Sequence, residues 1–183
     1  MNLLDDQQRG SIAGEGATFL FLENCKNEHT YARLDGLTTF LKPSSGANVS
    51  QRLHEFLAAH GLSAGDISLL ILGLNGDPRT DLIYHTLAET DFSGTPLAYF
   101  KHLCGEYHTA SAFATWMAAM ALKTQSVPEV VRVNSASYPK TIPFRNIQES
   151  TPAITSHQSI LEHVLIYNHF QENNHSFILL SSI

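Results

Sequence analysis

The stretch Asp66-Ile67-Ser68-Leu69-Leu70-Ile71-Leu72-Gly73-Leu74-Asn75-Gly76 decides the fold class of this 183-residue chain. Its apolar run over residues 67–72 is too short for a helix and lacks the alternation of a strand with one face in water. A short continuous run of this kind is typical of a strand covered on both faces, as in a parallel sheet between helices. The sequence therefore predicts an α/β protein that buries this strand in its sheet.

The segments around this strand alternate between helix and strand patterns. Residues 47–60 and 81–91 predict helices, and residues 97–100 predict a short strand. The apolar positions at helical spacing in the first helix are Val49, Leu53, Phe56 and Leu57. Residues 109–122, which include Trp116, are apolar on every side, which predicts a fully buried helix.

Further strands complete the predicted sheet. They are expected over residues 17–23, 30–37, 161–167 and 176–181, the last two close enough to pair antiparallel. Residues 126–152 contain four prolines, which break helices and remove ladder donors, so this region predicts a short strand at 129–133 and then a long irregular connection. Together the elements predict one domain over residues 1–183, an α/β layer fold with a mostly parallel sheet and right-handed crossovers.

Composition excludes several classes of function. Eleven Lys and Arg against seventeen Asp and Glu give a net charge of −6, so no basic footprint for nucleic acid is present. No apolar run reaches the roughly 20 residues of a membrane span, and the N-terminus carries no signal-peptide pattern, so we expect no membrane contact and a cytoplasmic location. The two cysteines and ten histidines lack zinc-site spacing, and neither a metal nor a cofactor is expected.

Four segments, in order, resemble motifs of one enzyme family. The run Arg9-Gly10-Ser11-Ile12-Ala13-Gly14-Glu15-Gly16-Ala17-Thr18-Phe19-Leu20-Phe21-Leu22-Glu23 resembles the GEGA segment that opens the second half of the β-ketoacyl-carrier-protein synthases. The run 66–76 lies where that family has its first catalytic histidine motif. Lys101-His102-Leu103-Cys104-Gly105-Glu106 is similar to the second motif, and Asn168-His169-Phe170 to the closing segment. The resemblance implies the C-terminal half of a thiolase-like fold, a five-stranded mixed sheet with a buried central helix.

The resemblance also implies where the chemistry would lie. Decarboxylative condensation needs a thiolate that carries the acyl chain and donors that polarise a thioester carbonyl. In the family two motif histidines donate and a lysine organises the second, whereas the nucleophilic cysteine belongs to the N-terminal half, which has no counterpart here. In this sequence Asn75 and Glu106 replace the two histidines, Lys101 is retained, and His108 follows as a possible substitute. These four are the candidate site residues.

Other replacements oppose synthase chemistry. Asp77 brings negative charge and Pro78 removes an amide in the first motif, and the closing glycines become Gln171-Glu172-Asn173-Asn174, which we expect to crowd the pocket mouth. Cys25 and Cys104 are interpreted as small buried residues rather than nucleophiles. The glycines of Gly14-Glu15-Gly16 predict a tight turn.

Three functional hypotheses remain at this stage. The first is a β-ketoacyl synthase-like protein of fatty acid or polyketide biosynthesis, with a finer resemblance to proteins of aryl-polyene clusters, that is non-catalytic alone and acts as a partner subunit or survives as a remnant. The second is the C-terminal portion of an active 3-oxoacyl-carrier-protein synthase completed by a separate N-terminal half. The third is an α/β binding or structural module with no related activity.

The helix over residues 109–122 also implies a partner. Apolar burial contributes roughly 25 cal/mol per Å², so a small domain that left such a helix in water would lose much of its stability. We therefore expect self-association, or association with a ketosynthase N-terminal half or a full ketosynthase, with an acyl carrier protein as a further partner.

Overall fold

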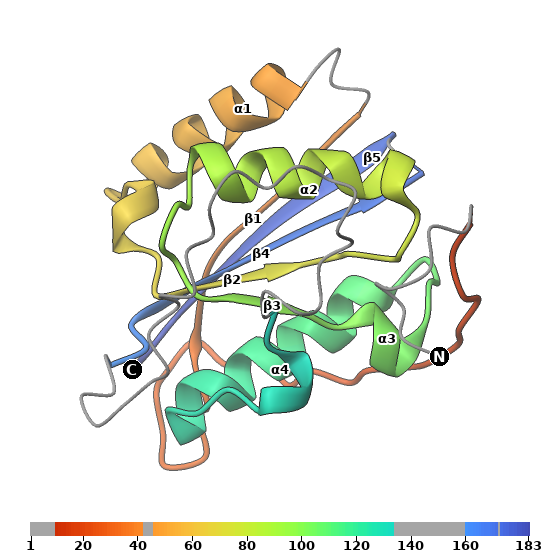
Figure 1. The fold of residues 1–183 in the computed structure, drawn as a ribbon. Coiled ribbons are helices and arrows are strands. Elements are labelled where there is room, and N and C mark those ends of the chain that lie inside the picture. Colours follow the sequence, from red (N-terminus) through yellow and green to blue (C-terminus); the bar gives the residue numbers. More distant parts are fainter. Residues whose placement is uncertain (1–9, 42–45, 134–159, 172) are drawn as a thin grey trace.

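A computed structural model describes residues 10–41, 46–133, 160–171 and 173–183. It contains one five-stranded sheet with helices on both faces (Figure 1). The strands are β1 (Arg33–Leu41), β2 (Leu69–Leu72), β3 (Leu97–Tyr99), β4 (His163–Phe170) and β5 (Asn174–Ser181). The helices are α1 (Gly46–Ala59), α2 (Pro78–Thr90), α3 (Lys101–Cys104) and α4 (Ala110–Thr124), with short 3₁₀ turns at Ala64–Asp66 and Glu129–Val131.

The sheet has the strand order β1-β5-β4-β2-β3. Strand β5 runs antiparallel to both of its neighbours, whereas β4, β2 and β3 run parallel to one another. Helices α1 and α2 cover one face, and α4 covers the other (Figure 1). The predicted α/β fold with a five-stranded, mostly parallel mixed sheet is confirmed.

The alternation of side chains explains why β2 reads as a continuous apolar run. Leu70 and Leu72 belong to the core cluster under α1 and α2, whereas Leu69 and Ile71 belong to the cluster under α4. All four side chains are buried. Because successive side chains of a strand point to opposite faces, a strand between two helical layers needs an apolar residue at every position.

The predicted helices form, with one change at a start. Val49, Leu53, Phe56 and Leu57 are buried on the inner face of α1. Helix α2 begins at Pro78, three residues before the predicted position, because Asp77 is its N-cap and accepts a hydrogen bond from the Arg79 backbone N–H at 3.0 Å. Proline is well suited to the first helical position, where no intrahelical donor is needed.

Two predicted strands are wrong. Residues 17–23 are extended, yet no described strand pairs with them, so the segment stays outside the sheet. Residues 129–133 start as the 3₁₀ turn Glu129–Val131, and only Arg132 forms an isolated bridge, with Ala98 of β3. The predicted strands at 30–37, 161–167 and 176–181 correspond to β1, β4 and β5, and the last two pair antiparallel as expected. Most of the predicted connection 126–152 lies outside the described residues.

The prediction that the helix at 109–122 is buried on every side is also wrong for this chain. Helix α4 packs small residues such as Ala114, Ala118 and Ala121 against the sheet. Its opposite side is open, and Trp116 remains 44% exposed. The apolar composition of the helix therefore did not reveal that the described residues cover only one of its faces.

Candidate functional site

The candidate site lies at one edge of the sheet. The parallel strands β2, β3 and β4 end at this edge, where the chain after β2 and β3 supplies Asn75 and Lys101, and the end of β4 itself supplies His169. In α/β sheets, ligands bind outside the carboxyl ends of the parallel strands. Three of the four predicted site residues meet here, because the ends of strands far apart in sequence are neighbours in space.

Lys101 and Glu106 form the centre of the cluster. The Lys101 Nζ donates to Glu106 Oε2 at 2.6 Å and to the His169 carbonyl at 3.4 Å. Helix α3 is a single turn, and Gly105, with φ of +74°, lets the chain reverse so that Glu106 comes back to the lysine. Burial lowers the pKa of Lys101, and the nearby Glu106 carboxylate opposes that shift.

Asn75 reaches the same carboxylate from the other motif. Its Nδ2 donates to Glu106 Oε2 at 3.4 Å. Its Oδ1 accepts from the Asp77 backbone N–H at 2.9 Å and from Thr80 Oγ1 at 3.1 Å, which orients the amide. The Asn75 and Lys101 donors therefore converge on one oxygen atom of Glu106, although the two motifs are about thirty residues apart in the chain.

Asp81 holds the loop that carries Asn75. The carboxylate of Asp81 accepts from the backbone N–H groups of Asn75 at 3.0 Å and of Gly76 at 2.8 Å. Burial raises the pKa of Asp81 to about 7, while these two hydrogen bonds and Lys101 oppose the rise. Asp81 therefore lies inside the site network, in the first turn of α2.

Asp77 does not place free negative charge in the site. Its carboxylate caps α2 and binds the Arg79 side chain, which holds its pKa well below the usual range. It also accepts from the Gly10 backbone N–H at 2.8 Å. The charge expected to oppose an oxyanion is thus neutralised by a neighbour two residues away.

The N-terminal segment crosses the second motif at close range. Glu106 N–H donates to the Ile12 carbonyl at 2.8 Å, and Gly14 N–H donates to the Glu106 carbonyl at 3.1 Å. A Cβ on Gly14 would lie 2.0 Å from the Cys104 carbonyl oxygen. The predicted tight turn is therefore wrong: the glycine allows two backbones to touch. We call residues 10–14 the strap.

His108 is the predicted site residue that lies apart from the network. It is exposed, and its ring lies 4.7 Å from that of Phe170. The two cysteines also differ from expectation. Cys25 is exposed and Cys104 is half-buried, where burial raises the pKa of its thiol. Gln171 adopts a φ of +52°, so the backbone conformation that glycine would favour is retained without glycine; Glu172 lies outside the described residues.

His169 is a buried member of the cluster that residue type alone did not single out. Its Nε2 lies 2.9 Å from the Thr80 carbonyl, and its backbone N–H donates to Tyr84 Oη at 2.8 Å. Burial and then Lys101 lower its pKa to about 3. Asn168 lies beside it, with its Oδ1 buried and unpartnered among the described residues. The resemblance of Asn168-His169-Phe170 to the family's closing segment was the sequence feature that could have pointed to His169. The sequence does not show that this segment lies close to Lys101.

Comparison with solved structures gives the fold a name. The chain superimposes with a TM-score of 0.61 on the ishigamide ketosynthase/chain length factor, at 12% identity over 84% of this chain and 38% of that chain. It superimposes at 0.59 on an oxazolomycin ketosynthase domain of Streptomyces albus, at 16% identity over 84% of this chain and 45% of that one. This is the ketosynthase fold.

A third solved structure shares this fold. A type II polyketide synthase ketosynthase in complex with its acyl-carrier protein matches at a TM-score of 0.59 and 14% identity, over 85% of this chain and 39% of that chain. The ketosynthase-like chain spans less than half the length of these three solved chains. No family model and no curated protein matches its sequence.

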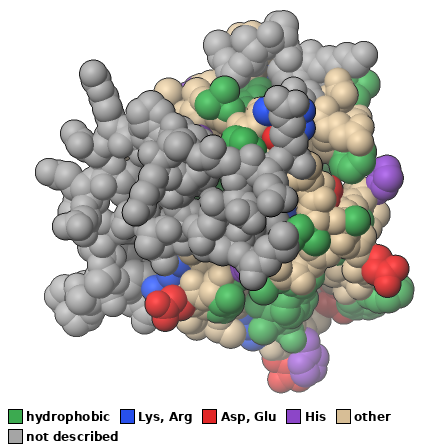
Figure 2. Space-filling view, turned by 45° about the vertical axis from the view of Figure 1, so that its right-hand side comes forward, with side chains coloured by type: hydrophobic (Ala, Val, Ile, Leu, Met, Phe, Trp, Pro, Cys, Tyr) green, Lys and Arg blue, Asp and Glu red, His purple; other side chains and the backbone are tan. Residues whose placement is uncertain are grey.

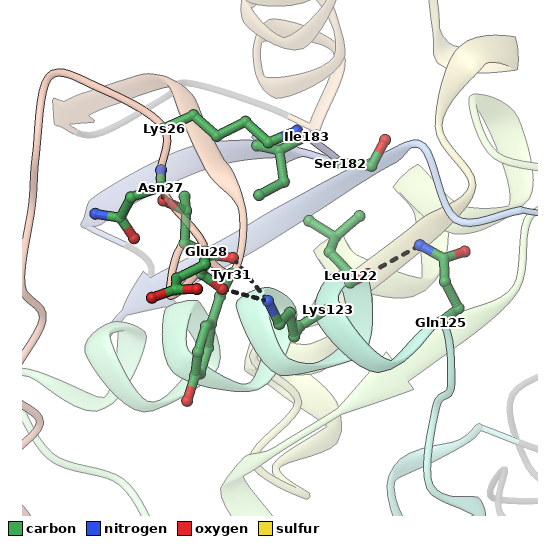
Figure 3. A pocket seen from close by; sticks show the side chains of 10 residues that line it. Lys26, Asn27, Glu28, Tyr31, Leu122, Lys123, Gln125, Ser182 and Ile183 are labelled. Atoms are coloured by element: carbon green, nitrogen blue, oxygen red, sulfur yellow. Dashed lines mark hydrogen bonds between the residues drawn. The ribbon is translucent and has the colours of Figure 1, made fainter.

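Two other kinds of site have no support among the described residues. No group of three His, Cys, Asp or Glu side chains there has the arrangement of a metal site, and none of the helices there has the length and apolar character to cross a bilayer. A hollow of about 450 Å³ lies beside the C-terminal end of α4 (Figure 3). Lys123 lines it and donates to the Thr30 carbonyl at 3.1 Å. Because Ser182, the residue after β5, lines it, this hollow is at the end of the sheet opposite the Lys101 cluster.

Proposed function

We propose that this chain is a ketosynthase-like partner subunit of fatty acid or polyketide biosynthesis and that it does not catalyse condensation alone. Within this group, its sequence most resembles the proteins of aryl-polyene clusters. The supporting fold neighbours include a ketosynthase/chain length factor and a ketosynthase in complex with an acyl-carrier protein. We extend the partner role to this chain, with a ketosynthase-type protein and an acyl carrier protein as its companions.

The observation that carries the proposal is the closed hydrogen-bond network around Glu106. A condensing site needs uncommitted donors aimed at a thioester carbonyl. Here the Lys101 ammonium and the Asn75 amide both donate to Glu106 Oε2, at 2.6 Å and 3.4 Å. A carboxylate only accepts hydrogen bonds, so Glu106 engages both of these donors and offers no donor of its own to a thioester carbonyl. A thioester oxygen at this place would meet a carboxylate instead of an imidazole.

The described cysteines give no alternative nucleophile. Attack on a thioester requires a thiolate, which forms readily where a positive charge or a helix N-terminus lowers the thiol pKa. Cys104 closes the short helix α3, and burial raises its pKa. Cys25 is exposed, and no described hydrogen bond or ion pair joins its side chain to a base. We therefore expect no acyl-enzyme to form on the isolated chain.

The direct test is a condensation assay. The purified chain is incubated with acyl-carrier protein and malonyl-carrier protein, and the products are followed by mass spectrometry, with an active ketosynthase as positive control. We expect no β-ketoacyl product and no acyl adduct on the chain. Product formed above the enzyme-free rate would overturn the proposal.

A second candidate is the C-terminal portion of an active 3-oxoacyl-carrier-protein synthase completed by a separate N-terminal half. It is favoured by two observations: the chain spans 38–45% of three matched ketosynthase chains, and it exposes Phe19 and Phe21 almost fully. Mixing the chain with a separately expressed N-terminal ketosynthase half tests it. Condensation that requires both polypeptides, and that Lys101→Met abolishes, would favour this candidate over the first.

A further inference from the structure

Residues 15–26 form an extended segment whose backbone has no hydrogen-bonded neighbour. From Glu15 to Lys26, no backbone N–H or carbonyl forms a hydrogen bond with any other described group. The segment is nevertheless held at both ends. Gly16 lies against the Tyr107 ring just before α4, and Lys123 near the end of α4 donates to the Thr30 carbonyl. Figure 1 shows the segment passing alongside α4.

The segment also carries the two most exposed large apolar side chains among the described residues. Phe19 is 94% exposed and Phe21 is 87% exposed, and Leu20 and Leu22 between and beside them are exposed as well. Figure 2 shows hydrophobic side chains gathered low on the molecule, at the height where Figure 1 places α4 and this segment. The open edge of an extended segment with apolar side chains is a template for pairing with another strand.

The apolar area is large enough for a dimer contact. Two phenylalanine side chains contribute on the order of 300 Å². Leu20 and Leu22 add exposed apolar area on the other side of the extended segment, because successive side chains alternate. Two such segments, side chains and backbones together, reach about 1,000 Å², the lower limit expected of a specific interface.

The sequence of the segment is self-complementary about Leu20. In an antiparallel pair with a two-fold axis at this residue, Leu20 faces Leu20 of the second copy, and Phe19 faces Phe21. Cross-strand aromatic pairs of this kind stabilise sheets. The charged residues fit the same register, because Glu15 faces Cys25 and Glu23 faces Ala17, so no like charges lie opposite one another.

We propose that two copies of this chain associate by antiparallel pairing of residues 15–25, centred on Leu20, with the exposed phenylalanines of both copies packed together. The pairing supplies partners for the free backbone groups, as strand addition does in other complexes. It does not depend on whether the Lys101 cluster is catalytic, so its failure leaves the proposed function standing.

A site-specific cross-link tests this register. Opposed residues of an antiparallel pair lie about 4.5–5.5 Å apart at Cα, within the range that a disulfide spans. In a Cys25→Ser background, Leu20→Cys should give a disulfide-linked dimer under mild oxidation. The matched control is Leu82→Cys on α2, an exposed leucine on the opposite helical layer, which should stay monomeric on a non-reducing gel.

Light scattering provides the second readout. We expect the wild-type chain to have twice its mass of 20.2 kDa, and Phe19→Asp/Phe21→Asp to have the single mass with an unchanged circular dichroism spectrum, since both rings are exposed. Leu82→Asp should remain dimeric. A wild-type monomer, a dimer without the Leu20→Cys cross-link, equal cross-linking of the control, or a dimer that survives the double substitution would each overturn the proposal.

Discussion

The Lys101 ammonium and the Glu106 carboxylate lie 2.6 Å apart, with the lysine side chain 1% exposed and the glutamate side chain 11% exposed. This ion pair joins the first residue of α3 to the residue after its C-cap Gly105. The same Glu106 oxygen accepts from the Asn75 amide, and that hydrogen bond joins the two resembled motifs in space. The stability of the site edge therefore depends on Glu106.

Removing one member of this pair should cost more than removing both. We expect Glu106→Ala to reduce the free energy of unfolding by about 3 kcal/mol, because it leaves a buried ammonium without its counter-charge. Lys101→Met/Glu106→Leu should recover most of that loss. Urea denaturation of the singles and the double measures the coupling. Arg33→Ala in the exposed pair with Asp35 is the control, with an expected loss below about 1 kcal/mol. Additive losses at Lys101 and Glu106 would contradict the prediction.

The contact of the strap with the second motif predicts the effect of Gly14→Ala. The added methyl group would lie 2.0 Å from the Cys104 carbonyl oxygen, so the backbones must separate. We expect a loss of about 1–3 kcal/mol and faster hydrogen exchange at the Glu106 amide, which donates to Ile12. Gly65→Ala, where the nearest atom is 3.8 Å away, should leave both unchanged. Slow exchange at the Glu106 amide in Gly14→Ala would show that the strap tolerates the methyl group.

Buried histidines should make the protein less stable in acid. Burial lowers the pKa of His169 to about 3 and of His85 to about 4, from 6.5. Between these values and 6.5 the unfolded chain binds protons that the folded chain does not, so stability falls as the pH falls. Asp81, with a pKa raised to about 7, acts in the opposite direction, since below that pH its folded form holds a proton that the unfolded carboxyl takes up only near 3.8.

The variant His169→Gln isolates one of these groups. Between pH 6.5 and 4, the unfolding free energy of this variant should fall less steeply than that of the wild type. The difference in slope should be up to about 1.4 kcal/mol per pH unit, the value for one proton. Thermal and urea unfolding across this range measure the difference. His54→Gln, at an exposed position, serves as the control. Parallel pH profiles for wild type and His169→Gln would mean that this histidine is not the group responsible.

The open side of α4 changes the expectation for its aromatic residue. Complete burial of Trp116 would predict a loss of roughly 3–5 kcal/mol for Trp116→Ala. Because the ring is 44% exposed, we expect about 1–2 kcal/mol, whereas the buried Met117→Ala should cost about 2–5 kcal/mol. Chemical denaturation at one fixed protein concentration compares the two. A loss for Trp116→Ala as large as for Met117→Ala would mean that another surface covers the ring.

Local patterns were reliable where one layer of neighbours decides the structure. The apolar run of β2 and the helical spacing of Val49, Leu53 and Leu57 were sufficient, because burial on a sheet face requires apolar residues at fixed intervals. The same reasoning failed at residues 17–23 and on α4. An apolar pattern says that a segment needs cover, but it does not say whether the described part of the chain provides it.

By itself, the sequence determined the α/β class and its main helices and strands, and its resemblance to two motifs singled out Asn75, Lys101 and Glu106. Only the tertiary structure decided that the Asn75 and Lys101 donors converge on one Glu106 oxygen, that His108 is exposed beside Phe170, and that Asp81 and His169 join the buried network. The physical reason is that periodicity encodes which face of an element is buried. Distances between the ends of parallel strands depend on how strands remote in sequence pair, and no local pattern contains them.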